Sequence, residues 1–436
     1  MSLSHRRTCL AAAIAGMIPA LLLLAAGGEH ADSDALAHLV WARQVVQHGS
    51  PRIARDGVFD DPSHYYPNTV PKPLPLLVAL PAAAAGGAGL LQAQYLVFAF
   101  LGLLAAAFLA LREGGGARSA WWASLALGMN PAWVMLTIRC RPAVILIAAV
   151  LALPALTRFS VLEPLAALTR PEGIFVSAWR SLRSRRGAGL AILLAAVAAW
   201  PLLNLWAAGD PLWSLREVRL AVEQMDYPTP GLAAYPLLLL RRLFLVAGPV
   251  FVLVLFSRIR RWPLAVPLAA WAATLWASLS GGSLVLPRYL DPLVLLTVPW
   301  SVVMLVRMMP AGNLRAVNAV LALAVAASLT LWPSALADWQ REHGIQMALE
   351  RLGRDGWRGR LAMNELLVPR VAEAAGVTDL SRGFVALDRA AWEGVDLDSL
   401  DVGTVAVVDH PVYLPEHTME YLESGGISPD TLWTED

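Results

Sequence analysis

Two aspartates, Asp32 and Asp34, follow the first apolar run of the chain and begin a polar interval that extends from residue 28 to residue 75. The amphipathic residues 35–48 come directly after them and predict a short helix. A helix that begins at Ala35 would hold Asp34 at its N-terminus, where the helix dipole and free N–H groups favour an ionised carboxylate. Such a carboxylate can act as a general base toward an incoming hydroxyl. We therefore expect Asp34 or Asp32 to be a catalytic base.

The same helix would place His38 one turn after Asp34, so His38 is a candidate substrate-binding residue. The helix would also have an apolar face, which is suited to lying in the membrane interface. That face would consist of Leu36, Leu39, Val40 and Val46.

Lys72 stands near the end of the polar interval and is the only lysine among the 34 basic residues of the chain. A single ammonium group at headgroup depth can meet a lipid phosphate as a point charge. Three neighbouring prolines, Pro71, Pro73 and Pro75, stiffen the backbone around it. We expect Lys72 to bind a phosphate, and the alternative is an interfacial anchor for the next apolar run.

A charged pair interrupts the weakly apolar residues 161–179, in the sequence Thr169-Arg170-Pro171-Glu172-Gly173. Charges inside an apolar segment are unfavourable, and Pro and Gly at the same place predict a broken helix. We expect Arg170 to face a polar cavity that accepts a phosphate, with Glu172 binding substrate. An internal Arg170–Glu172 pair that closes the break is the structural alternative.

Arg288 precedes the apolar run at residues 289–309, within Arg288-Tyr289-Leu290-Asp291-Pro292. We expect Arg288 to be a second phosphate ligand and Tyr289 to lie beside the substrate. The alternative is an interfacial tyrosine next to an ion pair between Arg288 and Asp291.

A metal site is a further hypothesis for the polar interval. Carboxylates and imidazoles suit Mg²⁺, Mn²⁺ or Zn²⁺. No close ligand spacing favours such a site, so we assign no metal ligands and leave Mg²⁺ or Mn²⁺ as an open cofactor. The residues available to it are Asp60, Asp61 and His64, together with Asp32 or His30.

The composition is that of a membrane protein: 57% of the 436 residues are hydrophobic and 15% are charged, with a mean hydropathy of +0.55. Soluble domains average about 25% charged residues. The formal net charge of +1 conceals an asymmetry, since residues 334–436 carry 19 acids and 8 arginines. We expect an all-α polytopic membrane domain, residues 1–333, and a small acidic extracytoplasmic α/β domain, residues 334–436.

About eleven apolar runs are candidates for membrane spans, each of which needs about 20 residues. The excess of arginine in alternate loops places the N-terminus inside and the C-terminal domain outside, with Arg112 and Arg118 as an exception on the outer side. The first run can alternatively be a cleaved signal peptide. The runs cover residues 8–26, 74–91, 92–111, 119–137, 142–157, 161–179, 188–208, 233–256, 263–281, 289–309 and 314–333.

The acidic tail has the alternating pattern of a small α/β domain, without a Gly-rich phosphate loop or a nucleophile elbow. We interpret it as an accessory or recognition module. Helices are expected at residues 338–353, 369–375 and 415–424, and strands at residues 360–363 and 404–408.

Four short motifs together resemble the GT-C glycosyltransferases, integral-membrane enzymes that use polyprenyl-phosphate-linked sugars. Residues 34–51 look like the family's first outer loop, in which an acid is followed by a short helix and a glycine. Residues 72–77 resemble the Lys-Pro-Pro-Leu start of the second span in aminoarabinose transferases and protein O-mannosyltransferase relatives. Residues 168–173 and 288–290 resemble two later signatures, so the similarity in layout covers roughly residues 8–333.

The resemblance implies a GT-C-like fold at the outer face of a bacterial cytoplasmic (inner) membrane, in contact with membrane lipids. It implies transfer of a sugar from a polyprenyl-phosphate-linked donor to a glycan, lipid or protein acceptor, by an inverting direct displacement. Asp34 matches the catalytic acid of the first loop. Lys72, Arg170 and Arg288 match ligands of the donor phosphate. The family often shows adjacent acids where one residue here separates Asp32 from Asp34, so Asp32 also remains a candidate base.

A transporter or flippase of lipid-linked saccharides is the rival interpretation. It predicts polar residues at mid-membrane depth in several spans and inverted repeats with broken helices. Here the polar groups concentrate at the outer edge and no repeat is visible, which favours an enzyme. An O-antigen ligase or polymerase would instead carry a large outer loop late in the chain, where this chain has a terminal domain. We expect no nucleic-acid partner.

Overall fold

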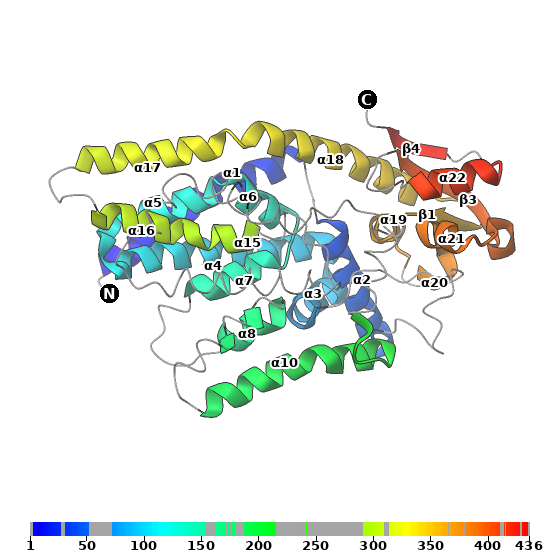
Figure 1. Ribbon diagram of the computed structural model, residues 1–436, viewed down its shortest axis with the longest axis horizontal. Helices are drawn as coiled ribbons and strands as arrows, with labels where there is room; N and C mark the ends of the chain where they lie inside the picture. Colours follow the sequence, from blue (N-terminus) through cyan, green and yellow to red (C-terminus); the bar gives the residue numbers. More distant parts are fainter. Residues whose placement is uncertain are drawn as a thin grey trace. The chain divides into compact units, whose positions relative to one another are not determined.

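The computed structural model (Figure 1) is mainly helical. It describes residues 3–27, 31–51, 72–152, 162–170, 173–174, 177–178, 187–214, 237, 241, 291–308, 314–364, 366–377, 380–409, 414, 416–427 and 430–434.

Three helices among the described residues are long and apolar enough to cross a membrane, as judged by length and composition. A fourth span is added if a bent pair of helices, which meet at 118°, counts as one. Of the expected runs at 233–256 and 263–281, the structure describes only residues 237 and 241, so a total of eleven spans stays a prediction. The first of the three is α1 (Leu3–Gly27). The second covers Gly87–Glu113, that is, α4 (Gly87–Ala110) and the start of η1 (Leu111–Gly115), and the third covers Gly189–Ala208 within α10 (Gly187–Ala208). The bent pair consists of α6 (Pro131–Ile138) and α7 (Ala143–Ala152).

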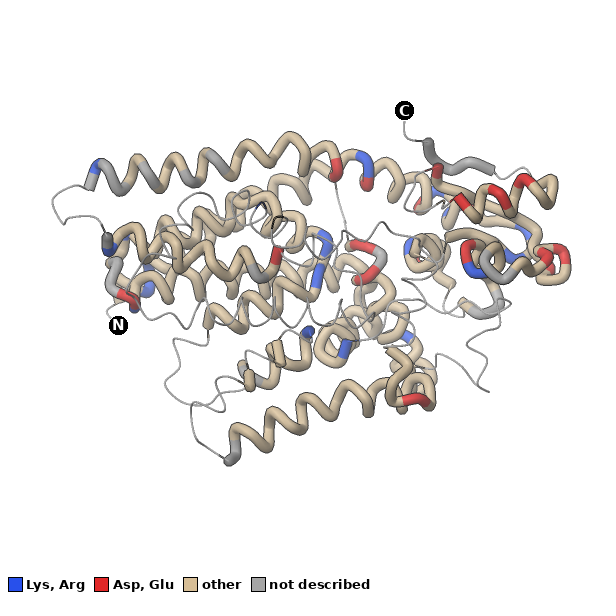
Figure 2. Tube along the Cα trace, in the orientation of Figure 1, with Lys and Arg blue, Asp and Glu red and all other residues tan. Residues whose placement is uncertain are grey.

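Charged residues lie at the ends of these apolar helices and not along them (Figure 2). Arg6 and Arg7 fall in the first turns of α1, and Arg112 and Glu113 follow the last turn of α4. This distribution is expected of membrane spans, because a charge in the hydrocarbon region is costly to bury.

The run expected to span the membrane at residues 74–91 is shorter in the structure. It forms α3, Pro73–Ala85, whose 13 residues measure about 20 Å, less than a hydrocarbon core of about 30 Å. The chain then turns at Gly87, whose φ of +60° favours glycine. The prediction of two consecutive spans at 74–91 and 92–111 is therefore wrong. The short helix α3 is followed by the long helix α4, which begins at Gly87 and not at residue 92.

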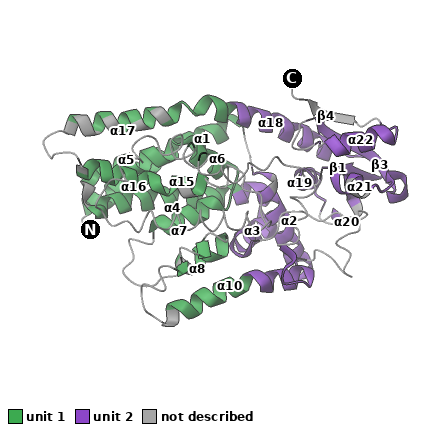
Figure 3. Cartoon of the chain, in the orientation of Figure 1, with its two compact units in different colours: residues 1–30, 92–199, 229–336 green, residues 31–91, 200–228, 337–436 purple. Residues whose placement is uncertain are grey.

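The chain divides into two compact units (Figure 3). Unit 1 comprises residues 1–30, 92–199 and 229–336, and unit 2 comprises residues 31–91, 200–228 and 337–436. The expected division at residues 333/334 lies close to the last of these boundaries. Unit 2, however, also takes up the polar interval that carries Asp34 and Lys72.

In unit 1, α1 packs closely against α5 (Gly116–Gly128) through small residues. Ser124 Oγ donates a hydrogen bond to the carbonyl of Ala12 at 3.0 Å. A Cβ atom on Gly128 would lie only 2.2 Å from the carbonyl oxygen of Gly16, so this position needs glycine. Small residues that bring two backbones together are typical of helix pairs inside membranes.

Several helix ends meet at one end of unit 1. Cys9 in α1 packs with Ala120 in α5 and with Leu111 after α4. Arg307, near the end of α16 (Thr297–Met308), forms an ion pair with Glu113 at 3.6 Å. The expected topology placed Arg112, and with it Glu113, on the outer side, and it placed the end of the run at 289–309 on the inner side. It is wrong, because the two faces of a bilayer are about 30 Å apart. The shortness of α3 explains the error, since α4 then returns the chain to the side on which α1 began.

The remaining described helices of unit 1 extend this bundle. Trp122 of α5 donates from Nε1 to Asn318 of α17 (Leu314–Leu329) at 3.2 Å. The short helix α8, Leu162–Thr169, packs on α7 through Ala166 and on α10 through Ala167. A further short helix, α15, covers Asp291–Leu295.

The C-terminal part of unit 2 contains a four-stranded parallel sheet with the strand order β2-β1-β3-β4. Side chains alternate between its faces, as the pleat requires: Leu361 and Met363 join one apolar cluster and Ala362 joins the other. The strands are β1 (Arg360–Met363), β2 (Phe384–Ala386), β3 (Val402–Asp409) and β4 (Asp430–Thr434), and the helices are α18 (Trp332–Asp355), α19 (Val368–Ala375), α20 (Leu380–Gly383), α21 (Leu387–Glu393), η5 (Leu397–Leu400) and α22 (Glu416–Ser424).

Candidate active site

The acid-bearing helix α2 runs from Ser33 to His48. Asp32 is its N-cap, because the carboxylate accepts a hydrogen bond from the backbone N–H of Ala35 at 3.0 Å. Asp34 therefore lies in the first turn and not at the cap, and its side chain is partly exposed. The helix ends at Gly49, which has a φ of 74°. The two aspartates thus differ in position, since Asp32 caps the N-terminus of the helix and Asp34 lies within its first turn.

Helix α2 is buried on all sides along its first half, from Ala35 to Ala42. Val46, expected on the same apolar face as Leu36, is 50% exposed, whereas Leu36 is 1% exposed. The prediction of a helix lying in the membrane interface is therefore wrong for this half. The reason is that both α3 and the C-terminal domain pack against this half of α2. The amphipathic pattern of the sequence indicates only one apolar face and so does not reveal the second partner.

His38 connects the starts of α2 and α3. Its Nδ1 lies 2.6 Å from the backbone oxygen of Asp34, and its Nε2 lies 3.2 Å from the backbone nitrogen of Lys72. A carbonyl can only accept and a backbone N–H can only donate, so the proton is on Nδ1 and the lone pair on Nε2. The ring is 2% exposed. Both of its nitrogens are thus bonded to the protein backbone.

Burial lowers the pKa of His38 to about 3, and the positive charge of Lys72 acts in the same direction. The hydrogen bond to the Asp34 carbonyl and the negative charge of Asp34 oppose this lowering. The ring is therefore neutral near pH 7. The side chains of Lys72 and Asp34 both act electrostatically on one buried ring, although the two residues are far apart in sequence.

Lys72 occupies the position before the first residue of α3, with an extended backbone (φ −93°, ψ 135°). Pro73 follows at the first helical position, where its fixed φ suits the helix and its missing N–H is not needed. The sequence thus sets where α3 starts, and His38 binds the backbone at that point. The structure brings Asp34, His38 and Lys72 together within unit 2.

The comparisons with known proteins concern the fold. No protein-family model matches the sequence, and a search of curated proteins finds no match. Among solved structures, the crystal structure of ArnT from Cupriavidus metallidurans bound to undecaprenyl phosphate matches with a TM-score of 0.50 and 17% sequence identity, over 97% of this chain and 88% of that chain. The chain has an ArnT-like fold. At this level of identity the likeness concerns the fold alone.

Arg170 belongs to unit 1 of the ArnT-like fold, directly after α8 ends at Thr169. The expected helix break is present at this place. A Cβ atom on Gly173 would lie 1.8 Å from the carbonyl oxygen of Ala166, so the returning backbone requires glycine there. A role for Arg170 in phosphate binding remains a prediction.

Several expected site residues of the ArnT-like fold lie outside the described residues. Among the residues that the structure does describe, no group of three or more His, Cys, Asp or Glu side chains could hold a metal ion. The hypothesis of a divalent cation is untested, because most of its residues are not described. The expected residues outside the description are Glu172, Arg288 and Tyr289 for the donor and His30, Asp60, Asp61 and His64 for a metal.

The sequence did not predict the partners of α2 in the C-terminal domain. Arg43 pairs with Glu373, and Arg370 contacts the chain just before the helix. Glu373 and Arg370 gave no signal, because an ion pair across about 330 residues leaves no local spacing to detect.

Proposed function

We propose that the protein is a membrane glycosyltransferase of the GT-C type, which moves a sugar from a polyprenyl-phosphate-linked donor to an acceptor. The main support is that His38 brings the backbone of Lys72 to the helix that carries Asp34. An ArnT-like fold in a chain with apolar spans is consistent with this chemistry. The structure of ArnT contains undecaprenyl phosphate, which is a lipid of the proposed donor class.

In the proposed reaction, an acceptor hydroxyl attacks the anomeric carbon while Asp34 accepts the hydroxyl proton. The bond between the anomeric carbon and the phosphate oxygen breaks, and polyprenyl phosphate leaves with the negative charge. The ammonium of Lys72 stabilises that charge electrostatically. One base acting on the face opposite the leaving group gives inversion. Asp32 is less suited to be the base, because it caps α2.

The additional ligands remain part of the proposal. Arg170 and Arg288 would complete the binding of the donor phosphate, and Glu172, Tyr289 and His38 were expected to contact substrate. His38 is better suited to positioning than to substrate contact, because both of its ring nitrogens bond to the backbone. The acceptor would be a glycan, a lipid or a protein.

We place the protein in a bacterial cytoplasmic (inner) membrane with the reaction on the outer face. At one end of unit 1, the ends of α1, α4 and α5 lie together and carry Arg6, Arg7, Arg112 and Arg118. Arg307 pairs with Glu113 at the same end. An excess of arginine marks the cytoplasmic side. The N-terminus would therefore be inside, and Arg112 and Arg118 no longer contradict the rule.

The test is transfer of a radiolabelled sugar from polyprenyl-phosphate donors in proteoliposomes. Asp34→Asn removes the base, and transfer should fall by about 10²–10⁴-fold. Asp32→Ser is the matched control, since serine is also a good N-cap and activity should remain close to wild type. If Asp32→Ser were inactive and Asp34→Asn active, the assignment of the base would be wrong.

A transporter of lipid-linked saccharides is the second candidate, favoured by the bend of 118° between α6 and α7, because broken helices are frequent in transporters. Movement of intact lipid-linked sugar across the bilayer without transfer would establish it. A glycosyltransferase would instead form labelled product in step with loss of donor.

A further inference from the structure

The C-terminal domain contacts α2 through an ion pair between Arg43 and Glu373 of α19. Arg43 Nη2 donates to Glu373 Oε1 at 2.9 Å, and Nη1 pairs with Oε2 of the same carboxylate. Each side chain is only 18% exposed. A two-point Arg–carboxylate pair fixes direction as well as distance, and partial burial protects it from screening by salt.

A second polar contact holds the start of α2. Arg370, also on α19, donates from Nη2 to the backbone carbonyl of Ala31 and pairs through Nη1 with Glu350 of α18 at 3.3 Å. The guanidinium side chain is 5% exposed. Ala31 directly precedes the N-cap Asp32, so this contact acts on the segment that leads into the turn with Asp34.

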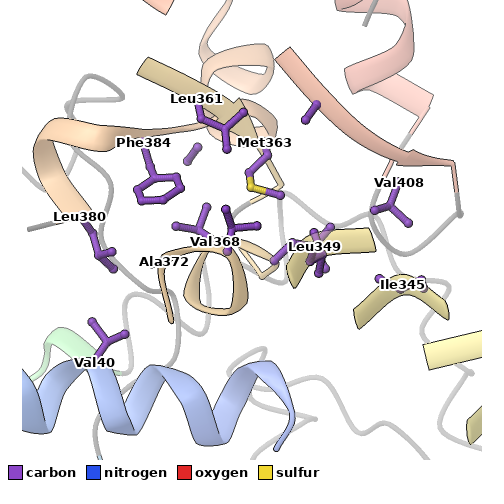
Figure 4. Close-up of a cluster of buried hydrophobic side chains, with 14 residues drawn as sticks. Val40, Ile345, Leu349, Leu361, Met363, Val368, Ala372, Leu380, Phe384 and Val408 are labelled. Carbon is purple, nitrogen blue, oxygen red and sulfur yellow. The ribbon is translucent and has the colours of Figure 1, made fainter. Parts of the chain in front are cut away.

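An apolar contact lies between these two polar contacts. Val40 of α2 is 3% exposed and belongs to the buried cluster on one face of the C-terminal sheet. In Figure 4, Val40 points from α2 toward Ala372 of α19 and Leu380 of α20. Helix α2 is therefore a structural part of the C-terminal domain, although nearly 300 residues separate the two along the chain.

The same ion pair also meets the turn between α3 and α4. A Cβ atom on Gly87 would lie 3.1 Å from Glu373 Oε1 and 3.6 Å from Arg43 Nη2. Gly87 is the first residue of α4 and directly follows Gly86, the C-cap of the helix that begins next to Lys72. Helix α19 thus lies beside both α2 and the turn that follows α3.

We propose that the C-terminal α/β domain positions the acid-bearing helix, and that Arg43, Glu373 and Arg370 are its positioning residues. They hold the chain just before α2 and the second half of the helix, so that Asp34 keeps a fixed place relative to Lys72. The consequence for catalysis rests on the proposed function, whereas the positioning itself does not. The domain previously interpreted as an accessory module is then required for the geometry of the site.

Hydrogen–deuterium exchange of the full-length protein in nanodiscs tests the positioning without any assay of activity. Glu373→Arg should raise the exchange rate of the amides of residues 31–51 by about tenfold or more, because local opening becomes easier. Arg43→Glu should do the same. The double exchange of the two residues restores an ion pair, and protection should return toward wild type. Glu420→Arg, an exposed charge reversal on α22 of the same domain, is the control and should leave these amides unchanged.

Steady-state kinetics then test the link to catalysis. A misplacement of about 1 Å can lower a rate by about 10²-fold, so Glu373→Gln should lower kcat by about 10–10²-fold. KM for the donor should stay within about threefold of wild type, since loss confined to the transition state leaves ground-state binding intact.

The outcomes separate the two proposals. The positioning role would be overturned if both single variants exchanged the amides of residues 31–51 at the wild-type rate. It would also be overturned if the double variant were no better protected than the single variants. Raised exchange in a protein that transfers no sugar would keep the positioning role and contradict only the proposed function. An unchanged kcat despite raised exchange would reduce the domain to a structural support.

Discussion

The backbone N–H of Lys72 donates to Nε2 of His38 at 3.2 Å, across 34 residues of sequence. The other ring nitrogen donates to the Asp34 carbonyl at 2.6 Å. One neutral imidazole therefore connects the turn that carries the proposed base with the residue that carries the proposed phosphate ligand. The connection runs through the backbone carbonyl of residue 34 and the backbone N–H of residue 72, so it fixes where both residues stand.

Replacement of His38 should separate the two roles of its ring, which are volume and hydrogen bonding. His38→Phe keeps the volume but leaves the Lys72 N–H without its acceptor, a loss of about 1–3 kcal/mol. The apparent midpoint of thermal unfolding should fall, and sugar transfer should fall with it. His38→Gln retains an acceptor and should lose less in both measurements. Equal stability of wild type and His38→Phe would show that the hydrogen bond has little effect.

The stability of the protein should depend on pH through His38. Its folded pKa of about 3 lies below the unfolded value of 6.5, so the unfolded chain binds the extra proton between these two values. The stabilising contribution is fully present above pH 6.5 and is lost as the pH falls toward 3, by about 1.4 kcal/mol per pH unit. Thermal unfolding scans from pH 7.5 to 4.5 should show this slope in wild type and a smaller slope in His38→Phe.

The contact between α1 and α5 should tolerate no added methyl group at Gly128. A Cβ atom there would lie 2.2 Å from the Gly16 carbonyl, so Gly128→Ala should force the helices apart and destabilise the protein by about 1–3 kcal/mol. Gly383→Ala is the control, because its Cβ would meet only Val377 Cγ1 at 3.8 Å. Detergent thermal-shift assays that gave both variants the same midpoint would contradict the close packing.

Membrane sidedness is measurable with single cysteines. Cys9 and Cys140 are first replaced by alanine, since they are the two native cysteines. We propose that the basic end of unit 1 faces the cytoplasm, so Arg118→Cys should then react with an impermeant maleimide only after the cells are permeabilised. Glu420→Cys, in the C-terminal domain, should react in intact cells. Reaction of both positions in intact cells would place the basic end outside.

The sequence predicted the local features of the site well. Asp34 lies in the first turn of a short helix, and α3 begins directly after Lys72 with Pro73 at its first position. The tail elements at residues 360–363 and 415–424 also match β1 and α22 closely. These features depend on nearest neighbours in the chain, such as caps, prolines and alternating apolar residues, and sequence patterns report those directly.

Features that depend on distant contacts were not predictable. Hydropathy did not show that the apolar run after Lys72 is divided at Gly87, because a single glycine lowers the mean hydropathy of a long apolar window only slightly. The strand β2, Phe384–Ala386, has only three residues and leaves no alternating pattern. The pair Arg43–Glu373 connects residues 330 positions apart, so only folding identifies it.

That separation has a consequence for biogenesis. A ribosome makes α2 some 330 residues before it makes Glu373, and domains fold in order as they emerge during synthesis. Until the last hundred residues have been translated, Arg43 and Val40 lack the surface against which they pack in the folded protein. A truncated chain would therefore lack the contacts that hold α2, so that the helix carrying Asp34 is fixed in place only when the chain is complete.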